Sequence, residues 1–234
     1  MLFEDLKEMY NQYRKKYGKK AYNYLSQLLK EAKETHKKDG KTKPRKKGDY
    51  KQNWQAFKEK NMQKLVLHII ASEVRELGLE AVNRQKIERT RKLPYELGRV
   101  KRNLLVDYKE FGMFLPEVDI IIYEPKSLNV ICVISSKVTV RERIAQTGYW
   151  KFKLKEEPAT EHIRVYFVTL DEDGSLTQKE PAKKGRAIAE KDLDGSYVLT
   201  EEEIEESKKV KLFERFIEDL RNLLENDEKI KKIV

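Results

Sequence analysis

The chain has 234 residues, 39% of them hydrophobic and 38% charged, with a formal net charge of +10 and an isoelectric point near 9.3. A single cysteine and three scattered histidines exclude a disulfide framework and a Cys/His zinc site, and no stretch approaches the roughly 20 apolar residues of a membrane-spanning helix. The excess of basic residues favours a polyanionic partner; the alternative is a solvated, lysine-rich surface without one.

Two further features of the composition bear on the origin of the chain. The abundance of Lys and Glu is typical of proteins from hot environments, where ion-pair networks cost less to desolvate. The lack of paired cysteines and of a signal-peptide pattern in the acidic N-terminal segment indicates a reducing compartment. We therefore expect a cytoplasmic protein.

Helical periodicity dominates the first half of the chain. Apolar residues recur at helical spacing over residues 2–35, with an expected break at Gly18, and residues 52–78 carry the clearest apolar stripe. Between these helices, residues 37–51 form a basic segment with Gly and Pro, which is either a linker or a DNA-contacting loop. Residues 83–103 are again strongly basic.

Strands are expected in the second half. The β-branched runs at residues 118–123 and 130–136 flank a turn and predict an antiparallel hairpin. The other expected elements are a helix at 138–154, strands at 165–170 and 197–199, a helix start at Thr200 and a last helix over about 207–226. This order predicts an α/β protein with a small mixed sheet flanked by helices. We divide the chain into an N-terminal helical and basic region, residues 1–48, and a second domain, residues 49–234.

Two polar residues lie at the ends of the expected hairpin. Asp119 opens its first strand and Lys137 closes its second, and adjacent antiparallel strands can bring such ends side by side. A carboxylate there could hold Mg²⁺, and a lysine could position or help activate an attacking water. Taken alone, the two residues are more often ordinary surface residues.

A charged triplet, Arg141-Glu142-Arg143, stands at the start of the helix that follows. The planar fork of an arginine matches O6 and N7 of guanine in the major groove, and a glutamate can accept hydrogen bonds from the amino group of cytosine. The triplet therefore has the chemistry to read adjacent G·C pairs. The alternative is an ordinary solvated turn of helix.

The stretch VDIIIYEPKSLNVICVISSKVTVRER, residues 118–143, resembles the catalytic core of type II restriction endonucleases of the PD-(D/E)xK superfamily. It is most similar to the BsaWI/EcoRII/PspGI-like group, which reads CCGG or CC-N-GG cores. Ser135-Ser136-Lys137 matches the Ser-x-Lys form of that group's second motif, and Arg141-Glu142-Arg143 matches its Arg-(Asp/Glu)-Arg triplet. The resemblance implies a restriction-endonuclease-like fold and makes residues 49–234 the nuclease domain.

The resemblance also implies roles for individual residues. Asp119 would be the metal-binding carboxylate, Lys137 the catalytic lysine, and the backbone carbonyl of Ser136 a further metal ligand. The arginines of the Arg141-Glu142-Arg143 triplet would hold guanines, and its glutamate would bridge cytosines. Each good bidentate contact of this kind contributes about 1–3 kcal/mol of discrimination.

The second metal-site carboxylate departs from the pattern of the group. Ser135 stands where the superfamily usually has an acidic residue, and the substitute glutamate on the following helix is absent from its expected position. Family members also carry a glutamate on the helix before the hairpin. Glu73, on the apolar side of its helix, is our candidate for this catalytic and metal-binding role, with Glu110 and Glu117 as rivals. A structural ion pair would explain Glu73 equally well.

The implied function is that of a Mg²⁺-dependent type II restriction endonuclease, which cuts double-stranded DNA at a short palindrome with CC and GG arms (CCGG, CCWGG or CCNGG) and leaves 5′-phosphate ends. Reading a palindrome with one triplet per chain requires a homodimer, and a cognate DNA methyltransferase would be its functional partner in a restriction-modification system. The basic residues Lys43, Arg45, Arg84 and Arg91 are expected to contact the DNA backbone.

Two alternatives stay open at this point. A repair or recombination nuclease of the same fold would share Asp119 and Lys137 but would need no base-reading triplet. A DNA-binding protein without catalysis would need neither residue, and the presence of the pair argues against it.

Overall fold

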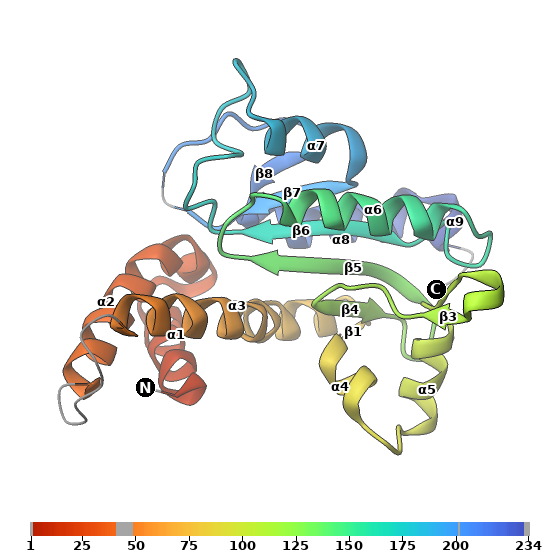
Figure 1. The fold of residues 1–234 in the computed structure, drawn as a ribbon, viewed down its shortest axis with the longest axis horizontal. Helices are drawn as coiled ribbons and strands as arrows, with labels where there is room; N and C mark the ends of the chain where they lie inside the picture. The colour runs from red at the N-terminus through yellow and green to blue at the C-terminus, as the bar shows by residue number, and fades with distance from the viewer. Residues whose placement is uncertain (1, 41–48, 201, 232–234) are drawn as a thin grey trace.

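The structure is a computed structural model that describes residues 2–40, 49–200 and 202–231. Its centre is a six-stranded mixed sheet in the order β1-β4-β5-β6-β7-β8 (Figure 1). The strands are β1 (Glu80–Asn83), β4 (Ile120–Tyr123), β5 (Val130–Lys137), β6 (Arg164–Thr169), β7 (Gly195–Val198) and β8 (Val210–Leu212). The β1-β4 and β4-β5 pairs are antiparallel, whereas β5 to β8 run parallel to one another. The expected α/β fold with a mixed sheet flanked by helices is confirmed.

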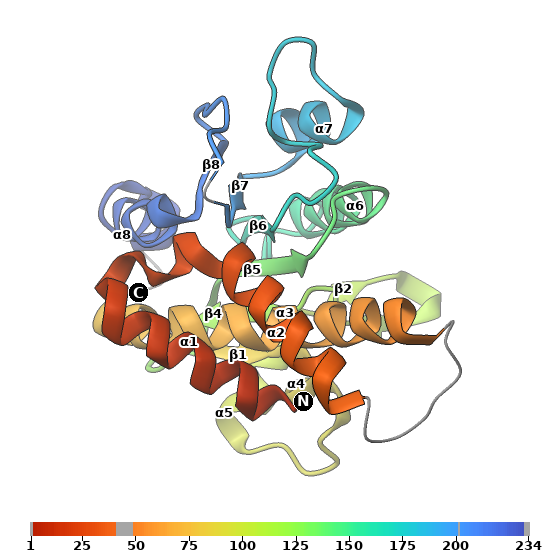
Figure 2. The same ribbon diagram turned by 90° about the vertical axis from the view of Figure 1, so that its left-hand side faces the viewer.

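Helices cover both faces of the sheet. They are α1 (Phe3–Tyr17), α2 (Leu25–Gly40), α3 (Asp49–Glu76), α4 (Arg84–Arg89), α5 (Tyr95–Arg102), α6 (Arg143–Lys155), α7 (Lys184–Asp192), α8 (Phe216–Asn226) and α9 (Glu228–Lys231), with short 3₁₀ turns η1 (Gly18–Tyr24), η2 (Lys109–Phe111) and η3 (Phe213–Arg215). Figure 2 shows α6 and α7 on one side of the sheet and α8 on the other. The helix α3 packs on the same face as α8. In the described parts of the chain, no helix is long and apolar enough to cross a membrane.

The central hairpin forms as the apolar runs predict. Ile120 and Ile122 of β4 face the core beside α3, whereas Ile121 faces the core on the opposite side of the sheet. A strand buried on both faces reads as a continuous apolar run instead of an alternating one. The carboxylate of Glu124 closes the turn, because it accepts hydrogen bonds from the backbone N–H groups of Lys126 and Ser127.

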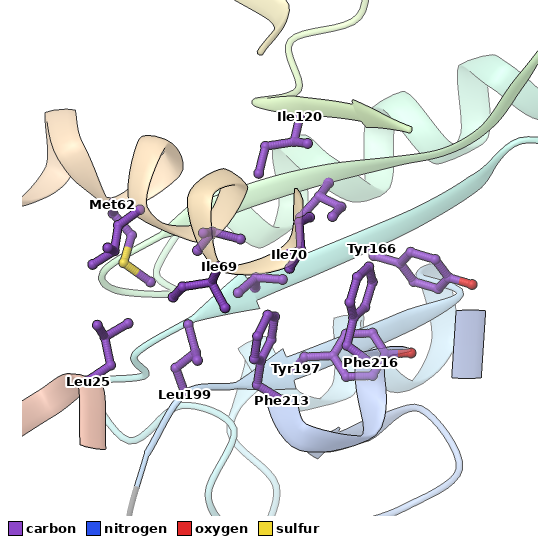
Figure 3. Close-up of a cluster of buried hydrophobic side chains, with 14 of the residues drawn as sticks. Leu25, Met62, Ile69, Ile70, Ile120, Tyr166, Tyr197, Leu199, Phe213 and Phe216 are labelled. Atoms are coloured by element: carbon purple, nitrogen blue, oxygen red, sulfur yellow. The ribbon is translucent and has the colours of Figure 1, made fainter. Parts of the chain in front are cut away.

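The core between α3, α8 and the sheet is rich in aromatic rings (Figure 3). Phe216 of α8 meets Tyr166 of β6 and Tyr197 of β7 edge-on, with ring centroids 5.9 and 5.1 Å apart. Edge-to-face pairs at such distances are favourable because the positive edge of one ring meets the negative face of the other. Ile69 and Ile70 of α3 close the cluster from the other end.

The N-terminal helices share this core. Leu6 of α1 and Leu25 and Leu28 of α2 belong to the same buried cluster as Ile120 and Ile134 of the sheet. The expected break at Gly18 is confirmed, since α1 ends there and the 3₁₀ turn begins. The basic segment at residues 41–48, which holds Lys43 and Arg45, lies outside the described residues.

Two helix boundaries differ from the prediction. The helix expected at 138–154 begins only at Arg143, after a turn that leads out of β5. No helix starts at Thr200, and the segment before residue 216 contributes β8 and a 3₁₀ turn instead. The buried guanidinium of Arg186 donates to the Glu205 carbonyl, and the Glu205 N–H donates to the Thr177 carbonyl. These tertiary bonds occupy backbone groups of Glu205 that a helix would use, and local propensity does not predict them.

A large-to-small substitution at the centre of the sheet tests this packing. Phe167 of β6 is fully buried, so Phe167→Ala is expected to destabilise the fold by about 3–5 kcal/mol through lost contacts and a residual cavity. Urea denaturation followed by circular dichroism measures the loss. Glu225→Ala, at an exposed position of α8, is the control; equal stability of the two variants would contradict the described core.

Candidate active site

The side chains of Asp119 and Lys137 meet at the ends of β4 and β5. The strand register pairs Ile120 with Ile134, which brings the residue before β4 beside the end of β5. Lys137 Nζ lies 2.8 Å from Asp119 Oδ2, and the Ser136 N–H donates to the same oxygen over 2.8 Å. The expected side-by-side placement of Asp119 and Lys137 is therefore confirmed, while their roles stay predictions.

The backbone of Asp119 is held from both sides. Its N–H donates to the carbonyl of Ile134 on β5, and its carbonyl accepts from the N–H of Arg84 at the start of α4. The Asp119 side chain is 14% exposed and that of Lys137 33%, so the pair is accessible from solvent yet held in place. Both hydrogen bonds to the carboxylate engage Oδ2, and Oδ1 can take a further ligand.

Two serine hydroxyls are buried near the end of β5, one on each face of the sheet. Continuing the strand register places Ser135 opposite Asp119, and alternation along β5 puts the Ser135 and Lys137 side chains on one face of the sheet. The Oγ atoms of Ser135 and Ser136 are buried and have no hydrogen-bond partner in the described parts of the chain. A buried hydroxyl without a partner costs about 1–3 kcal/mol, a cost that a catalytic position can explain.

The Arg141-Glu142-Arg143 triplet is exposed where the chain turns from β5 into α6. Arg141 has a φ of +35°, in the left-handed region of the backbone that residues other than glycine rarely adopt. Asp173 supports this conformation, since its two carboxylate oxygens accept the N–H groups of Val140 and Arg141 over 3.2 and 3.4 Å. The orientation of the first arginine of the triplet therefore depends on a carboxylate from another loop.

The loop that carries Asp173 is itself tied down by a carboxylate. Asp171 accepts the N–H groups of Ser175 and Leu176 and the hydroxyl of Thr177, while Gly174 takes a φ of +58°. Burial raises the pKa of Asp173, but its hydrogen bonds outweigh this effect and hold the pKa below its ordinary value. Sequence reasoning missed Asp173; the only local signal was the turn-forming composition of residues 171–174.

A chain of side-chain contacts joins the triplet to the strand that carries Asp119. The guanidinium of Arg143 lies 3.4 Å from the Gln146 side-chain oxygen, and the Gln146 amide nitrogen donates to the Glu117 carboxylate. Glu117 stands two residues before Asp119. The contacts therefore link the start of α6 to the segment that leads into β4.

The structure places Glu73 apart from the Asp119-Lys137 pair, so the position expected for it is not observed. Its carboxylate pairs with Arg14 at 3.3 Å, and it lines a separate pocket of about 210 Å³ between α1, α3 and α8. Gln63 of α3 lies level with Asp119, because its side chain accepts a hydrogen bond from Asn83, and the N–H of the next residue, Arg84, donates to the Asp119 carbonyl. Glu73 lies ten residues further on, which is roughly 15 Å along a helix axis. The helical period indicates which face of α3 carries Glu73, but it does not indicate the distance along the helix axis between Glu73 and the active site.

The other acidic and basic candidates lie as follows. Glu110 is exposed in η2, between the strands β2 (Val106–Asp107) and β3 (Met113–Phe114) of a small two-stranded sheet. Arg84 forms a bidentate pair with Glu88, and Arg91 is exposed between α4 and α5. Within the described ranges, no three His, Cys, Asp or Glu side chains are grouped to share one metal ion.

A cleft of about 800 Å³ opens between α2, α3 and the carboxyl ends of β6 and β7. Those ends point toward the N-terminal helices in Figure 1. Lys30, Lys33 and Lys58 line the cleft, and Glu172 pairs with the buried Lys58 at 2.6 Å. Because Glu172 precedes Asp173, one loop forms both a wall of the cleft and the support of the Arg141 turn.

Comparison with known proteins gives this arrangement a class. Residues 96–219, which include the Asp119-Lys137 pair and most of the mixed sheet, match the family described as BsaWI restriction endonuclease type 2. A putative type II restriction enzyme, MjaVIP of Methanocaldococcus jannaschii, is 38% identical over 174 residues, which are 72% of this chain and 76% of that protein. The chain belongs to the BsaWI family of type II restriction endonucleases.

Two more proteins are similar. The probable type II restriction enzyme HpyAORF263P of Helicobacter pylori is 39% identical over 100 residues, which cover 42% of this chain and half of that protein. The solved complex of restriction endonuclease PspGI with substrate DNA aligns over 88% of this chain and 76% of its own, with 16% identity and a TM-score of 0.46. As a member of its family, the chain is a sequence-specific type II restriction endonuclease, a site-specific deoxyribonuclease of a kind that generally uses divalent metal ions.

The support of the Arg141 turn predicts a pH-dependent stability. Because the pKa of Asp173 is lowered in the folded state, its carboxylate stabilises the fold above the pKa of the unfolded chain, near 3.9, and the contribution is lost as the pH falls through the folded-state pKa. Asp173→Asn is expected to cost roughly 1–2 kcal/mol at pH 7. Urea denaturation across the pH range should show this difference shrinking below about pH 4; a difference that grows toward acid would contradict the assignment, and Glu225→Gln is the control.

Proposed function

We propose that this restriction endonuclease is Mg²⁺-dependent, and that Asp119, Lys137 and the Ser136 carbonyl form its catalytic centre. The observation that carries the proposal is the contact of Lys137 Nζ with Asp119 Oδ2 at paired strand ends, with the Ser136 N–H on the same oxygen. The further parts of the proposal are a palindromic site with CC and GG arms, a homodimer in the cytoplasm, and a cognate methyltransferase.

The donor atoms at this centre suit Mg²⁺. A carboxylate and a main-chain carbonyl are hard oxygen ligands, which Mg²⁺ prefers over nitrogen or sulfur, and Asp119 and Ser136 offer both within one hairpin. The bound ion would lower the pKa of a water molecule and neutralise charge on the phosphate. The partnerless Oγ of Ser135 adds a polar group on the same face of β5.

Lys137 has a role that follows from its position. Its ammonium group now neutralises the Asp119 carboxylate, and a lysine carries three donors on a flexible stem. With DNA bound, the same group would orient the attacking water and stabilise the negative charge that develops on the phosphate. Asp119 would hold the ammonium in place until substrate arrives.

Base reading is proposed for Arg141, Glu142 and Arg143. All three side chains are exposed at one end of the sheet, close to the ends of β4 and β5, so a duplex held by them would pass its backbone over Asp119. A bidentate arginine selects guanine and the glutamate selects cytosine. Two such triplets related by a two-fold axis would read CC and GG arms. Four basic residues would contact the phosphates: Lys43, Arg45, Arg84 and Arg91.

Loss of Lys137 tests the catalytic centre. We expect Lys137→Ala and Asp119→Asn to lower the rate of plasmid cleavage in Mg²⁺ by at least about 100-fold while DNA binding persists in Ca²⁺. Because Glu73 lies on another part of α3 and pairs with Arg14, Glu73→Gln is the matched control and should cleave at nearly the normal rate. Fast cleavage by Lys137→Ala would sink this assignment.

Sequence reading is tested with Arg143→Ala. Sequencing the ends of fragments cut by the wild-type protein at elevated temperature should give one palindrome with CC and GG arms. Arg143→Ala should weaken binding to that site by about 1–3 kcal/mol and relax discrimination at one base pair, whereas Arg91→Ala should weaken all duplexes alike. Fragments without a common sequence would leave a nuclease that reads no palindrome.

A further inference from the structure

An exposed aromatic surface has no place in the catalytic centre. Of seven large hydrophobic side chains that are exposed among the described residues, five lie together on the β2-β3 hairpin and on α6. With the half-buried Tyr108, they form what we call the aromatic patch: Tyr108, Phe111, Met113, Phe114, Tyr149 and Phe152. Phe111 is 74% exposed and Phe152 61%. A contiguous apolar surface of this kind marks an interaction site in a protein that is otherwise densely charged.

The patch is continuous because the hairpin packs on α6. The hairpin consists of β2 (Val106–Asp107) and β3 (Met113–Phe114). The hydroxyls of Tyr108 and Tyr149 lie 2.6 Å apart, and the Tyr108 ring meets the Phe114 ring edge-on at 5.4 Å. The ammonium of Lys153 lies over the rings of both Tyr108 and Phe152. The two segments therefore present one surface.

Helical spacing connects this surface to the base-reading triplet. Glu142, Ala145, Tyr149 and Phe152 are all exposed and follow one another at intervals of three or four residues, so they share one face of α6. The face begins at the glutamate of the triplet and ends on the aromatic patch. From Glu142 to Phe152 it extends roughly 15 Å.

We propose that the aromatic patch and this face of α6 are the two-fold interface between two copies of the chain. The inference deepens the proposed function and rests on its palindromic site. Two triplets that read neighbouring base pairs must both approach the two-fold axis. The exposed face of α6 starts at the triplet, so it would also lie near the axis and would face the same surface of the second copy.

Size and composition agree with a second copy as the occupant. A buried aromatic side chain covers about 150–250 Å², so the half to three-quarters exposed rings present roughly 500 Å², a large part of the roughly 800 Å² that each partner buries in a standard interface. Aromatic residues and Met are enriched in such interfaces. The rim carries both signs, with Lys109 and Glu110 on the hairpin and Lys153 and Glu156 on α6. Such a surface can pair with itself.

The test is the oligomeric state without DNA or metal. Sedimentation equilibrium is expected to give a dimer for the full chain and a monomer for Phe111→Ser/Phe152→Ser at the same micromolar concentration. Tyr95→Ser removes an equally exposed aromatic side chain on α5, outside the patch, and should leave the dimer intact. Unchanged circular dichroism and thermal melting would show that the double variant is folded.

A second measurement locates the axis. Cys132 is fully buried, so an introduced surface thiol is the one that reacts. Ala145→Cys should be cross-linked into a covalent dimer by a short bis-maleimide, and Tyr95→Cys should not. A monomeric wild-type chain, a dimeric double variant, or no cross-link through Ala145→Cys would each overturn the interface.

The two proposals can fail separately. Site-specific cleavage by a wild-type protein whose double variant is still dimeric would remove the interface and keep the function. A patch-dependent dimer that cuts no DNA in any divalent metal would keep the interface and remove the function.

Discussion

The register of β4 on β5 is the constraint on which the site depends. Ile120 lies opposite Ile134, and both are fully buried. A slip of one residue would turn the whole strand over and place Asp119 on the wrong face. Burial of the isoleucines on one face and of Ile121 and Val133 on the other makes such a slip costly, so the apolar core of the hairpin fixes the distance between a carboxylate and an ammonium group at its edge.

The parts of the molecule that the sequence predicts are those in which the signal is local. The β-branched runs of the hairpin and the apolar period of α3 each encode their own element, and the Asp119-Lys137 pair follows from the hairpin alone. The acidic segment after Thr200 has helical propensity, yet the backbone of Glu205 bonds to Arg186 and Thr177 instead of to helical neighbours. Those partners are distant in sequence, and nothing in the local pattern indicates them.

Glu73 and Asp173 show the same limit at the level of single side chains. The apolar period of α3 gives the direction in which Glu73 points, but its height along the helix is set by how α3 packs on β1, where Gln63 meets Asn83. Asp173 carries no motif at all. Its importance lies in a turn more than 30 residues earlier in the chain, whose N–H groups it accepts. A carboxylate that supports the backbone of a distant turn is visible only in three dimensions.

The contacts from Arg143 through Gln146 to Glu117 have a consequence for fidelity. In the roles proposed for Arg143 and Asp119, an arginine that does not fit its base would also shift the side chains that lead to the segment before β4. An imperfect site would then be penalised twice, once in residence time on the DNA and once in the speed of the chemical step. Because the two effects would multiply, a duplex that is bound by mistake would dissociate before it is cut.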